Sequence, residues 1–570
     1  MSDYERAVQA LERGIDRFVQ RQVLDGTSPR DGGCISSSWG IASPTSGDTC
    51  EMIRQFGLAY LTHESQYYTE SWLLDRIERA VAFQRRCQRP SGRIDLPTCN
   101  FDSAPDTAFG VSKLADLAWY ARSRSDTEGA KTIETALEPY LRSAAAGIAD
   151  GGFHTPNHRW VIAGALAQVH ELYPDESLVD TVESYLAEGI DINEDGEYTE
   201  RSHAIYSNVV NKHLIRASRS LDRPSLFDPV RRNLHTLVDF MNHDWTVDTS
   251  VSRRQDYGER TVPVRGAPNF YCVARRDADD RLATAAHGLL ENGGWDDPGV
   301  AADLLSHYAR NPSWRETDLP TGRRADAASR QMESSGVWRF RDGEFSVTVA
   351  TETSEVVSLS YGSSAMLELC VVSPYFGTGF FTGRDIAFAD ESVTVTLNRS
   401  FHDPDLPCYW KPLDRPVAWG DTESDEREVV PMPEFEPELT VDRVPDGIEL
   451  GLRTDGGISQ VPFAVEARFP GDGWLELERS TVPATSERPV FLGDETATYH
   501  RDGDAITLGP GFHGHRLSDS PDDPGSALRV LLTDWTPVDR RFAVTAGEWT
   551  GADLAARTSG GPSSVSGPSG

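Results

Sequence analysis

Polar residues stand where a helix is expected to begin, directly after a proline. The stretch "NHRWVIAGAL" opens with Asn157, His158 and Trp160 and then turns apolar. One interpretation is that the Asn157 side chain caps the helix by accepting a backbone N–H of the first turn. Capping gives no reason for His158 and Trp160, whose rings suit a carbohydrate site because sugar rings stack on aromatic faces. The stretch is therefore a candidate binding corner as well as a helix start.

A second segment, "EDGEYTERSHAIYSNVV", crowds Tyr198, Glu200, His203 and Tyr206 around the entrance of the next predicted helix. His203 and Tyr206 are three residues apart and so share a helix face. A tyrosine held beside a histidine can serve as a general acid or base. The alternative is a buried tyrosine with a satisfied hydroxyl and a histidine on the surface. The residues alone leave both interpretations open.

A third segment, "SVSRRQDYGERTVP", has no apolar periodicity and is predicted to be a loop. It contains Arg253, Arg254, Asp256 and Tyr257. Arginine binds carboxylates through two parallel N–H groups, which suits an acidic sugar. The other interpretation is a structural network between the arginines and Asp256.

A fourth polar loop, "CNFDSAPDTAF", supplies Asn100, Asp102 and Asp106. We place Asn100 and Asp102 among the candidate substrate-binding residues. Asp102 and Asp106 are also candidate carboxylates for a glycoside hydrolase, which needs one or two such groups beside the bond it breaks.

Two hydrophobic periods divide the chain that must position these residues. Apolar residues recur at helical spacing through the first half, in pairs of segments of about 15 residues joined by polar loops. Beyond Arg330 the period changes to two, with turns such as "RDG" between strand-like runs. We expect an incomplete (α/α) toroid at residues 1–315, a linker at 316–335, an antiparallel β-sandwich at 336–551 and a disordered Gly/Ser/Pro tail at 552–570.

The charge of the chain is strongly negative and its positive charge is almost all arginine. There are 89 acidic and 55 basic residues, a formal net charge of −34. The only lysines are Lys113, Lys131, Lys212 and Lys411. This composition resembles that of proteins from salt-loving archaea. It gives no basic patch for nucleic acid, so we expect no nucleic-acid partner.

Targeting and metal-binding signals are also missing from the sequence. The first residues form an amphipathic helix without an apolar leader, and no run of about 18 apolar residues occurs. We therefore expect a cytoplasmic protein with no membrane partner. The seven cysteines form no C-x-x-C pair, and we predict no metal and no cofactor. The sequence sets no oligomeric state.

The segments "NHRWVIAGAL", "DGEYTERSHAIYSNVV" and "SRRQD", in this order on a helical ring followed by a sandwich, resemble the polysaccharide lyases. The nearest types are the heparinase II/III-like and the alginate or chondroitin/hyaluronate lyase-like families. The resemblance implies β-elimination on an acidic polysaccharide or oligosaccharide. Asn157, helped by His158 or Arg254, would neutralise the uronate carboxylate, and Tyr206 would protonate the leaving oxygen. Either Tyr206 or a histidine, His158 or His203, would remove the C5 proton.

The chain departs from the family in its sandwich region. Heparinase II/III-like sandwiches often begin with an "HGHxD"-type strand, whereas "LSYGSSAMLELCVV" here has no histidine. The pair His513 and His515 comes much later in the chain, and we interpret it as part of a loop.

Two other functions compete with the lyase interpretation. An unsaturated-uronyl hydrolase could use the same helical ring with Asp102 and Asp106, although it would not need the large sandwich. A non-catalytic carbohydrate-binding protein would be favoured if Tyr206 lay in a core, away from His158 and Arg254.

Overall fold

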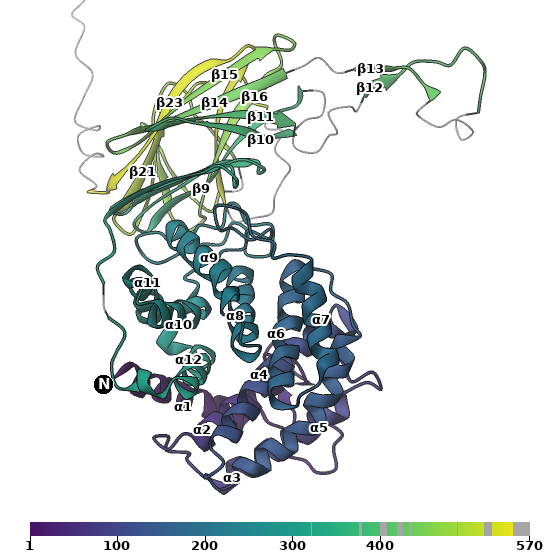
Figure 1. The fold of residues 1–570 in the computed structure, drawn as a ribbon. Coiled ribbons are helices and arrows are strands. Elements are labelled where there is room, and N and C mark those ends of the chain that lie inside the picture. Colours follow the sequence, from purple (N-terminus) through teal and green to yellow (C-terminus); the bar gives the residue numbers. More distant parts are fainter. Residues whose placement is uncertain are drawn as a thin grey trace, which may run out of the picture. The chain divides into compact units, whose positions relative to one another are not determined.

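Helices fill the first part of the chain and strands the second, as the two periodicities predict (Figure 1). This computed structural model describes residues 1–320, 322–375, 379–399, 407–418, 426–431, 435–486, 488–517 and 527–550. Two units can be separated. The helical unit comprises Met1–Met241 and Trp245–Ala325, and the sheet unit comprises Asn242–Asp244 and Asp326–Gly570.

Twelve α-helices in the described part of the helical unit form two layers. The outer layer consists of α1 (Asp3–Arg21), α3 (Ser71–Cys87), α5 (Ala130–Ala149), α7 (Glu176–Ala187), α9 (Phe227–Phe240) and α11 (Asp280–Glu291). The inner layer consists of α2 (Thr49–Leu61), α4 (Ala104–Ser123), α6 (Pro156–Leu172), α8 (Tyr206–Ser220), α10 (Ala267–Asp277) and α12 (Pro298–Arg310). Short 3-10 turns lie at Pro224–Leu226, Val264–Gly266, Gly294–Asp296 and Pro312–Arg315.

The inner helices form a ring. Each packs on the next even-numbered helix, and α12 returns to pack on α2 as well as on α1. The approach of α6 to α8 needs a glycine, because a Cβ on Gly164 of α6 would lie 2.8 Å from the backbone oxygen of His213 on α8. All thirteen residues of α2 are buried, as expected for a helix covered on every side. Because α12 packs on α1, the first and last helices of the unit meet.

Long connections precede several of the inner helices. They carry the short strands β1 (Cys34–Ile35), β2 (Ala42–Ser43), β3 (Ile94–Leu96) and β4 (Asn100–Ser103). Helix α4 starts where the Ser103 side chain accepts the N–H of Asp106. Pro156 occupies the first position of α6, where its missing N–H costs nothing. Because these connections end at helix starts, their polar residues collect around the beginnings of α4, α6, α8 and α10.

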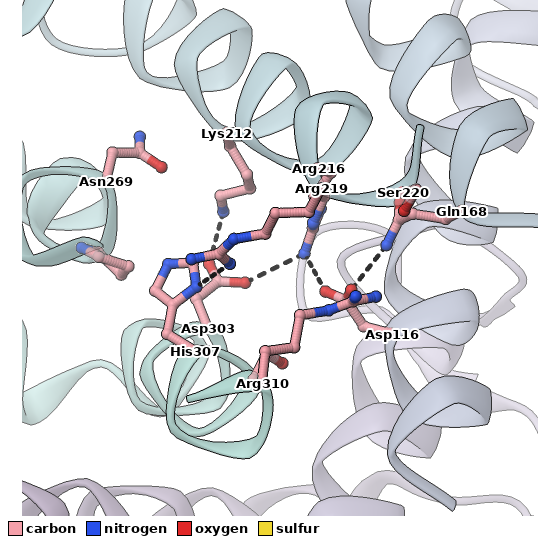
Figure 2. Close-up of a pocket in the computed structure, with 12 residues that line it drawn as sticks. Asp116, Gln168, Lys212, Arg216, Arg219, Ser220, Asn269, Asp303, His307 and Arg310 are labelled. Carbon is pink, nitrogen blue, oxygen red and sulfur yellow. Dashed lines mark hydrogen bonds and ion pairs between the residues drawn. The ribbon is translucent and has the colours of Figure 1, made fainter. Parts of the chain in front are cut away.

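The interior of the ring is charged. Lys212, Arg216 and Arg219 recur at helical spacing on α8, and Asp303 and His307 lie on α12 (Figure 2). Lys212 donates to Asp303 Oδ2 at 2.5 Å. Residues four apart share one helix face, so Lys212 and Arg216 face the same interior space.

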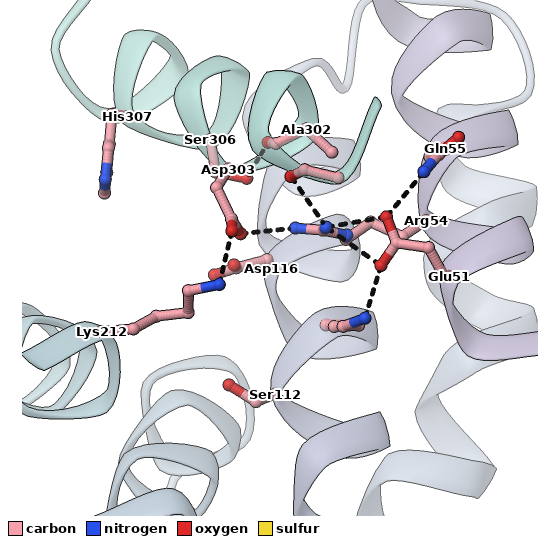
Figure 3. Close-up of polar contacts among 12 residues, drawn as sticks. Glu51, Arg54, Gln55, Ser112, Asp116, Lys212, Ala302, Asp303, Ser306 and His307 are labelled. Carbon is pink, nitrogen blue, oxygen red and sulfur yellow. Dashed lines mark hydrogen bonds and ion pairs between the residues drawn. The ribbon is translucent and has the colours of Figure 1, made fainter. Parts of the chain in front are cut away.

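Arg54 of α2 links this interior to the opposite side of the ring (Figure 3). Its guanidinium donates to Asp303 Oδ1 at 2.7 Å and to Glu51 Oε1 at 2.8 Å. The Arg54 side chain is only 2% exposed. A buried cation of this kind is stable only when it is paired, and the pairs join α2 to α12, where the ring closes.

Two antiparallel layers build the sheet unit. The first contains β5 (Ala327–Met332), β6 (Val337–Asp342), β7 (Phe345–Ala350), β8 (Glu355–Tyr361), β9 (Ser364–Ser373), β16 (Pro462–Phe469) and β22 (Leu528–Trp535), with β19 (Val490–Phe491) parallel to β22. The second contains β10 (Gly379–Phe388), β11 (Ser392–Arg399), β14 (Phe435–Val444), β15 (Gly447–Gly456), β23 (Asp539–Glu548), β21 (Asp504–Gly509), β20 (Ala497–Arg501), β17 (Trp474–Glu476) and β18 (Thr481–Pro483). A separate hairpin joins β12 (Pro407–Trp410) to β13 (Val429–Pro431).

One hydrophobic core fills the space between the two layers. Residues from both, such as Trp338 and Val371 from the first and Leu439 and Leu450 from the second, belong to one buried cluster. β10 pairs with both β9 and β11 and so connects the layers. The expected fold class, a helical toroid followed by an antiparallel sandwich, is confirmed.

The boundary between the units differs from the expected linker. Strand β5 begins at Ala327, inside the segment 316–335. Its sequence "AASRQM" is mostly exposed, and its polar residues come consecutively, so it lacks the apolar alternation that identifies a strand. The tail predicted at 552–570 lies outside the described residues. Among the described helices, none has the length and apolar character needed to cross a membrane.

Replacing Arg54 tests the ring-closing ion pairs. Arg54→Met should lower the free energy of unfolding by about 3–5 kcal/mol, because it leaves buried carboxylates short of a partner. Arg122→Met is the matched control, since Arg122 is 41% exposed beside Glu134 and should cost less than about 1 kcal/mol. Urea unfolding followed by far-ultraviolet circular dichroism measures both losses. Equal losses would contradict the structural role of Arg54.

Candidate functional site

The Glu200 carboxylate joins two segments that are far apart in the sequence. At the start of α6, Asn157 donates its backbone N–H to Glu200 Oε2 at 3.1 Å and its Nδ2 to Glu200 Oε1 at 2.9 Å. From the loop before α10, Arg254 Nε lies 3.3 Å from Glu200 Oε1. The Glu200 side chain is 6% exposed. One buried carboxylate thus holds the Asn157 and Arg254 segments together.

Arg254 also covers Tyr206, the first residue of α8. The guanidinium carbon of Arg254 lies 4.8 Å from the centre of the Tyr206 ring, where a cation is attracted to the ring face. The Tyr206 backbone N–H is held by Ser202 Oγ at 2.9 Å. The Tyr206 ring is half-buried, and among the described residues its hydroxyl makes no hydrogen bond. This leaves the hydroxyl available for a ligand.

His158 lies beside the same cluster and is held uncharged near neutral pH. Its ring contacts those of His154 and Phe109, with centroids 4.9 and 6.1 Å away. Burial, followed by the nearby His154 and Arg254, lowers the pKa of His158 from 6.5 to about 4. Its Nδ1 is buried and makes no hydrogen bond within the described part of the chain. A neutral imidazole with an unused nitrogen has the form needed to accept a proton.

The structure corrects the expected cap of α6. Thr155 occupies the capping position and makes no side-chain cap, while Asn157 follows inside the helix. The expectation that Asn157 itself caps the helix is therefore wrong. The distant Glu200 carboxylate takes that place, and a negative charge is favourable at a helix N-terminus. Burial nevertheless raises the pKa of Glu200 above its ordinary value, because desolvation outweighs the bonds from Asn157 and the charge of Arg254.

Three residues that the sequence analysis proposed for the site, Trp160, Tyr198 and His203, lie in the core of the helical unit. Trp160 has no exposed surface and donates its Nε1 to Asp191 Oδ1 at 2.9 Å. Tyr198 is buried, and its hydroxyl donates to Asn211 Oδ1 at 2.9 Å. Neither ring presents a face on which a sugar could stack, so we leave both out of the proposed site.

His203 is also buried, with both ring nitrogens engaged. Nε2 lies 2.8 Å from Glu197 Oε1, and Nδ1 lies 2.9 Å from the backbone oxygen of Asp248. The ring packs 3.9 Å from that of Phe240. Because neither nitrogen is available to a substrate, we leave His203 out and keep His158 as the histidine of the site.

The remaining candidates lie in the short strand β4 and in the loop before α10. Asp102 is bound by Arg93 at 2.9 Å, and Asn100 donates to Asp106 at 3.1 Å. Arg253 is exposed and donates its backbone N–H to the Glu200 backbone oxygen at 3.1 Å. Tyr257 is 38% exposed. No distance connects any of these side chains to Tyr206, so their substrate-binding role stays a prediction.

Two further residues support the site: Ser202, which the sequence analysis did not name, and Asp256, which it named only as a partner in a structural network with the arginines. Ser202 holds the start of α8 through the Tyr206 N–H. Asp256 is fully buried and accepts the Ala204 N–H at 3.0 Å and the Ser252 hydroxyl at 2.6 Å. Asp256 therefore fastens the arginine loop to the segment before α8 rather than pairing with Arg254. An acidic residue between two arginines and a tyrosine gives no sequence signal for such backbone contacts.

In the described part of the sheet unit, one trio of possible metal ligands lies close together. The ligand atoms of Glu355, Glu368 and Cys370 are within 4.8 Å of one another. Acidic groups in proximity are common without an ion, and nothing else at this position points to a metal. The predictions of no metal and no cofactor stay untested.

Solved structures with the same architecture are polysaccharide lyases. The chain aligns with the chondroitin AC lyase of Streptomyces coelicolor A3 in complex with chondroitin sulphate at a TM-score of 0.55 and 13% identity, covering 98% of this chain and 81% of that one. Heparinase III aligns with the chain at a TM-score of 0.54 and 11% identity, covering 96% of this chain and 85% of that one. The xanthan lyase of Paenibacillus aligns at a TM-score of 0.52 and 10% identity, covering 98% of this chain and 59% of that one. No protein-family model and no curated protein matches the chain. At these identities the likeness shows a shared fold, a helical toroid with a β-sandwich.

The role of Glu200 can be tested by its effect on stability. Glu200→Ala should lower the free energy of unfolding by about 1–3 kcal/mol, because the buried donors of Asn157 lose their acceptor. Glu188→Ala is the control, since Glu188 pairs with Arg159 while 51% exposed and should cost less than about 1 kcal/mol. Urea denaturation of both variants gives the two values. A Glu200 variant as stable as the wild type would show that the cluster does not depend on this carboxylate.

His158 should also leave a signature in the pH dependence of stability. The pKa is about 4 in the folded chain and about 6.5 when unfolded. Between these values the unfolded chain takes up a proton that the folded chain does not, so stability falls as the pH falls from about 6.5 to 4. His158→Gln should reduce that fall by about 1–2 kcal/mol, allowing for solvent around the half-buried ring. Denaturation at several pH values measures it, with the exposed His154→Gln as control. Parallel curves for the wild type and His158→Gln would contradict the shift.

Proposed function

We propose that the chain is a polysaccharide lyase that cleaves a uronic-acid-containing polysaccharide or oligosaccharide by β-elimination. The observation that carries the proposal is the connected cluster in which Glu200 binds Asn157 and Arg254 while Arg254 covers Tyr206. The shared fold with lyases for chondroitin, heparin-type and xanthan substrates supports the reaction class.

Arg254 is the group best suited to bind the uronate carboxylate. Its Nε faces Glu200, and the side chain keeps 23% of its surface exposed. Its terminal N–H groups form no hydrogen bond among the described residues, and such a pair of donors matches a carboxylate. The amide of Asn157, in contrast, already donates to Glu200. We therefore assign charge neutralisation mainly to Arg254 and assign Asn157 the task of holding Glu200.

The elimination moves one proton away from the sugar ring and another onto the leaving group. Binding of the carboxylate to Arg254 stabilises the negative charge that develops when the C5–H bond breaks. The neutral imidazole of His158, which is half-buried and keeps part of its surface exposed, accepts this proton, since a pKa of about 4 keeps the ring neutral at pH 7. A C4–C5 double bond forms as the C4–O bond breaks. Tyr206 donates its hydroxyl proton to the departing oxygen, and the cleavage consumes no water.

Ultraviolet absorbance provides the direct test. We expect one or more of alginate, hyaluronan, chondroitin, heparin, ulvan and pectin to gain the absorbance of the conjugated double bond when incubated with the full chain at high salt. Tyr206→Phe should lower kcat by about 100-fold to 10,000-fold, the usual contribution of a general acid. Its stability should change little, because the hydroxyl has no partner in the described structure.

Tyr198→Phe is the control tyrosine, because it removes a buried hydroxyl that donates to Asn211. It should reduce stability while the folded fraction retains its activity. An active Tyr206→Phe enzyme would overturn the proposed role of Tyr206. Loss of absorbance from unsaturated oligosaccharides would instead favour the hydrolase. Binding without a change in absorbance would favour a non-catalytic carbohydrate-binding protein.

A further inference from the structure

A second charged pocket lies inside the helical ring, at a distance from the proposed site (Figure 2). Its lining includes Lys212, Arg216 and Arg219 of α8, His307 and Arg310 of α12, and the carboxylates Asp116 and Asp303, which are paired with these cations. Thirteen residues of α8 separate Tyr206 from Arg219, which is about 20 Å along a helix. The pocket is therefore not part of the cluster around Glu200.

Cations outnumber carboxylates in the network around this pocket. The ion pairs and hydrogen bonds around it, which form separate groups, involve six cations and four carboxylates: Arg54, Lys113, Lys212, Arg216, Arg219 and Arg310 against Glu51, Asp116, Glu171 and Asp303. This excess of positive charge lies within a chain whose net charge is −34. The acidity of the molecule as a whole therefore does not extend to the interior of the ring.

Arg219 is the cation in this network without an acidic partner. It donates to His307 Nδ1 at 2.8 Å and to Cys272 Sγ at 2.9 Å. Neither partner carries a compensating charge, because burial lowers the pKa of His307 and raises the pKa of the Cys272 thiol. Its neighbour Arg310 contrasts with it, since Arg310 binds both oxygens of Glu171 at 2.9 and 3.0 Å. Arg219 is half-buried, so its unpaired charge has lost part of its hydration without gaining an acidic partner.

Further donors remain around Arg219. The bond from Arg219 to His307 Nδ1 places the proton of the neutral imidazole on Nε2, which is a donor. Lys212 spends one of its three N–H groups on Asp303. Both side chains are half-buried rather than sealed from solvent. Lys212 and His307 line the same pocket from different helices.

The size of the cavity limits what can bind. Its volume is about 20 Å³, enough for an ion or for ordered water. Pockets that hold organic ligands of drug size are about 300–1,000 Å³, so a sugar residue is too large. The donors are N–H groups, and the fork of an arginine matches the oxygens of a tetrahedral oxyanion.

We propose that this pocket binds a small inorganic oxyanion, of the sulfate or phosphate class, held by Arg219, Lys212 and His307. The anion neutralises the guanidinium that the chain leaves unpaired and joins α8 to α12. The site does not depend on the lyase function, because Arg219 takes no part in the cluster around Glu200.

Equilibrium dialysis of the full-length wild-type chain tests the site directly. Radiolabelled sulfate and radiolabelled phosphate are tested separately at constant ionic strength, and the anion that binds identifies the source. We expect saturable binding of about one anion per chain for at least one of them. A second measurement tests whether chloride at an equal concentration displaces the bound anion. No saturable binding, or displacement by an equal concentration of chloride, would overturn the proposal.

Arg219→Gln locates the site. It should weaken anion binding by about ten-fold or more, the usual effect of losing a charged hydrogen-bond donor. Arg223→Gln is the matched control, because Arg223 lies four residues further on, outside the pocket, with its side chain 41% exposed beside Glu183. Equal affinity in Arg219→Gln and the wild type would overturn the assignment. Should that variant not fold, Lys212→Gln serves in its place and should show the same loss.

Activity separates this proposal from the lyase proposal. Tyr206→Phe should bind the anion as the wild type does, while Arg219→Gln should keep any elimination activity. Loss of anion binding in Tyr206→Phe would contradict the separation of the two sites.

Discussion

The carboxylate of Asp303 is the interaction on which the helical ring depends. It is buried on α12 and accepts from Arg54 of α2, from Lys212 of α8 and, at 3.4 Å, from Arg216. These three cations come from both sides of the ring and would repel one another without it. The surrounding cations in turn hold the pKa of Asp303 well below its usual range despite burial. Through this residue the last inner helix is fixed to the first and to the helix that begins at Tyr206.

The candidate site follows from how the ring arranges its helix starts. Asn157 and Tyr206 each stand at the start of an inner helix, and Arg254 stands in the loop that precedes a third. Packing of adjacent inner helices brings these starts together, and Glu200 fixes them with charge-assisted bonds. The same bonds decide which donors are free. Since the Asn157 amide is used inside the protein, the guanidinium of Arg254 is left as the donor for an anionic substrate.

The architecture could be predicted from the sequence because each of the two hydrophobic periodicities extends over a long part of the chain and the two differ clearly. It was weaker for the site, for a physical reason that Trp160 illustrates. Helix α6 is apolar on nearly all sides, so spacing cannot tell which of its aromatic residues faces a cleft. Burial of Trp160, Tyr198 and His203 depends on partners such as Asp191, Asn211 and Glu197. The Glu200 contacts, likewise, span 43 residues of sequence. Short-range patterns cannot report such contacts.

Net charge also proved a poor guide to the interior. A composition with four lysines and a charge of −34 describes mainly what faces water. Inside the ring, where solvent screens charge less than at the surface, local pairing matters more. There, one of the four lysines and three arginines line a single pocket. Helix α8 begins at the proposed acid, Tyr206, and carries Arg219 near its end. An anion bound to Arg219 would therefore act at the end of this helix that is remote from Tyr206.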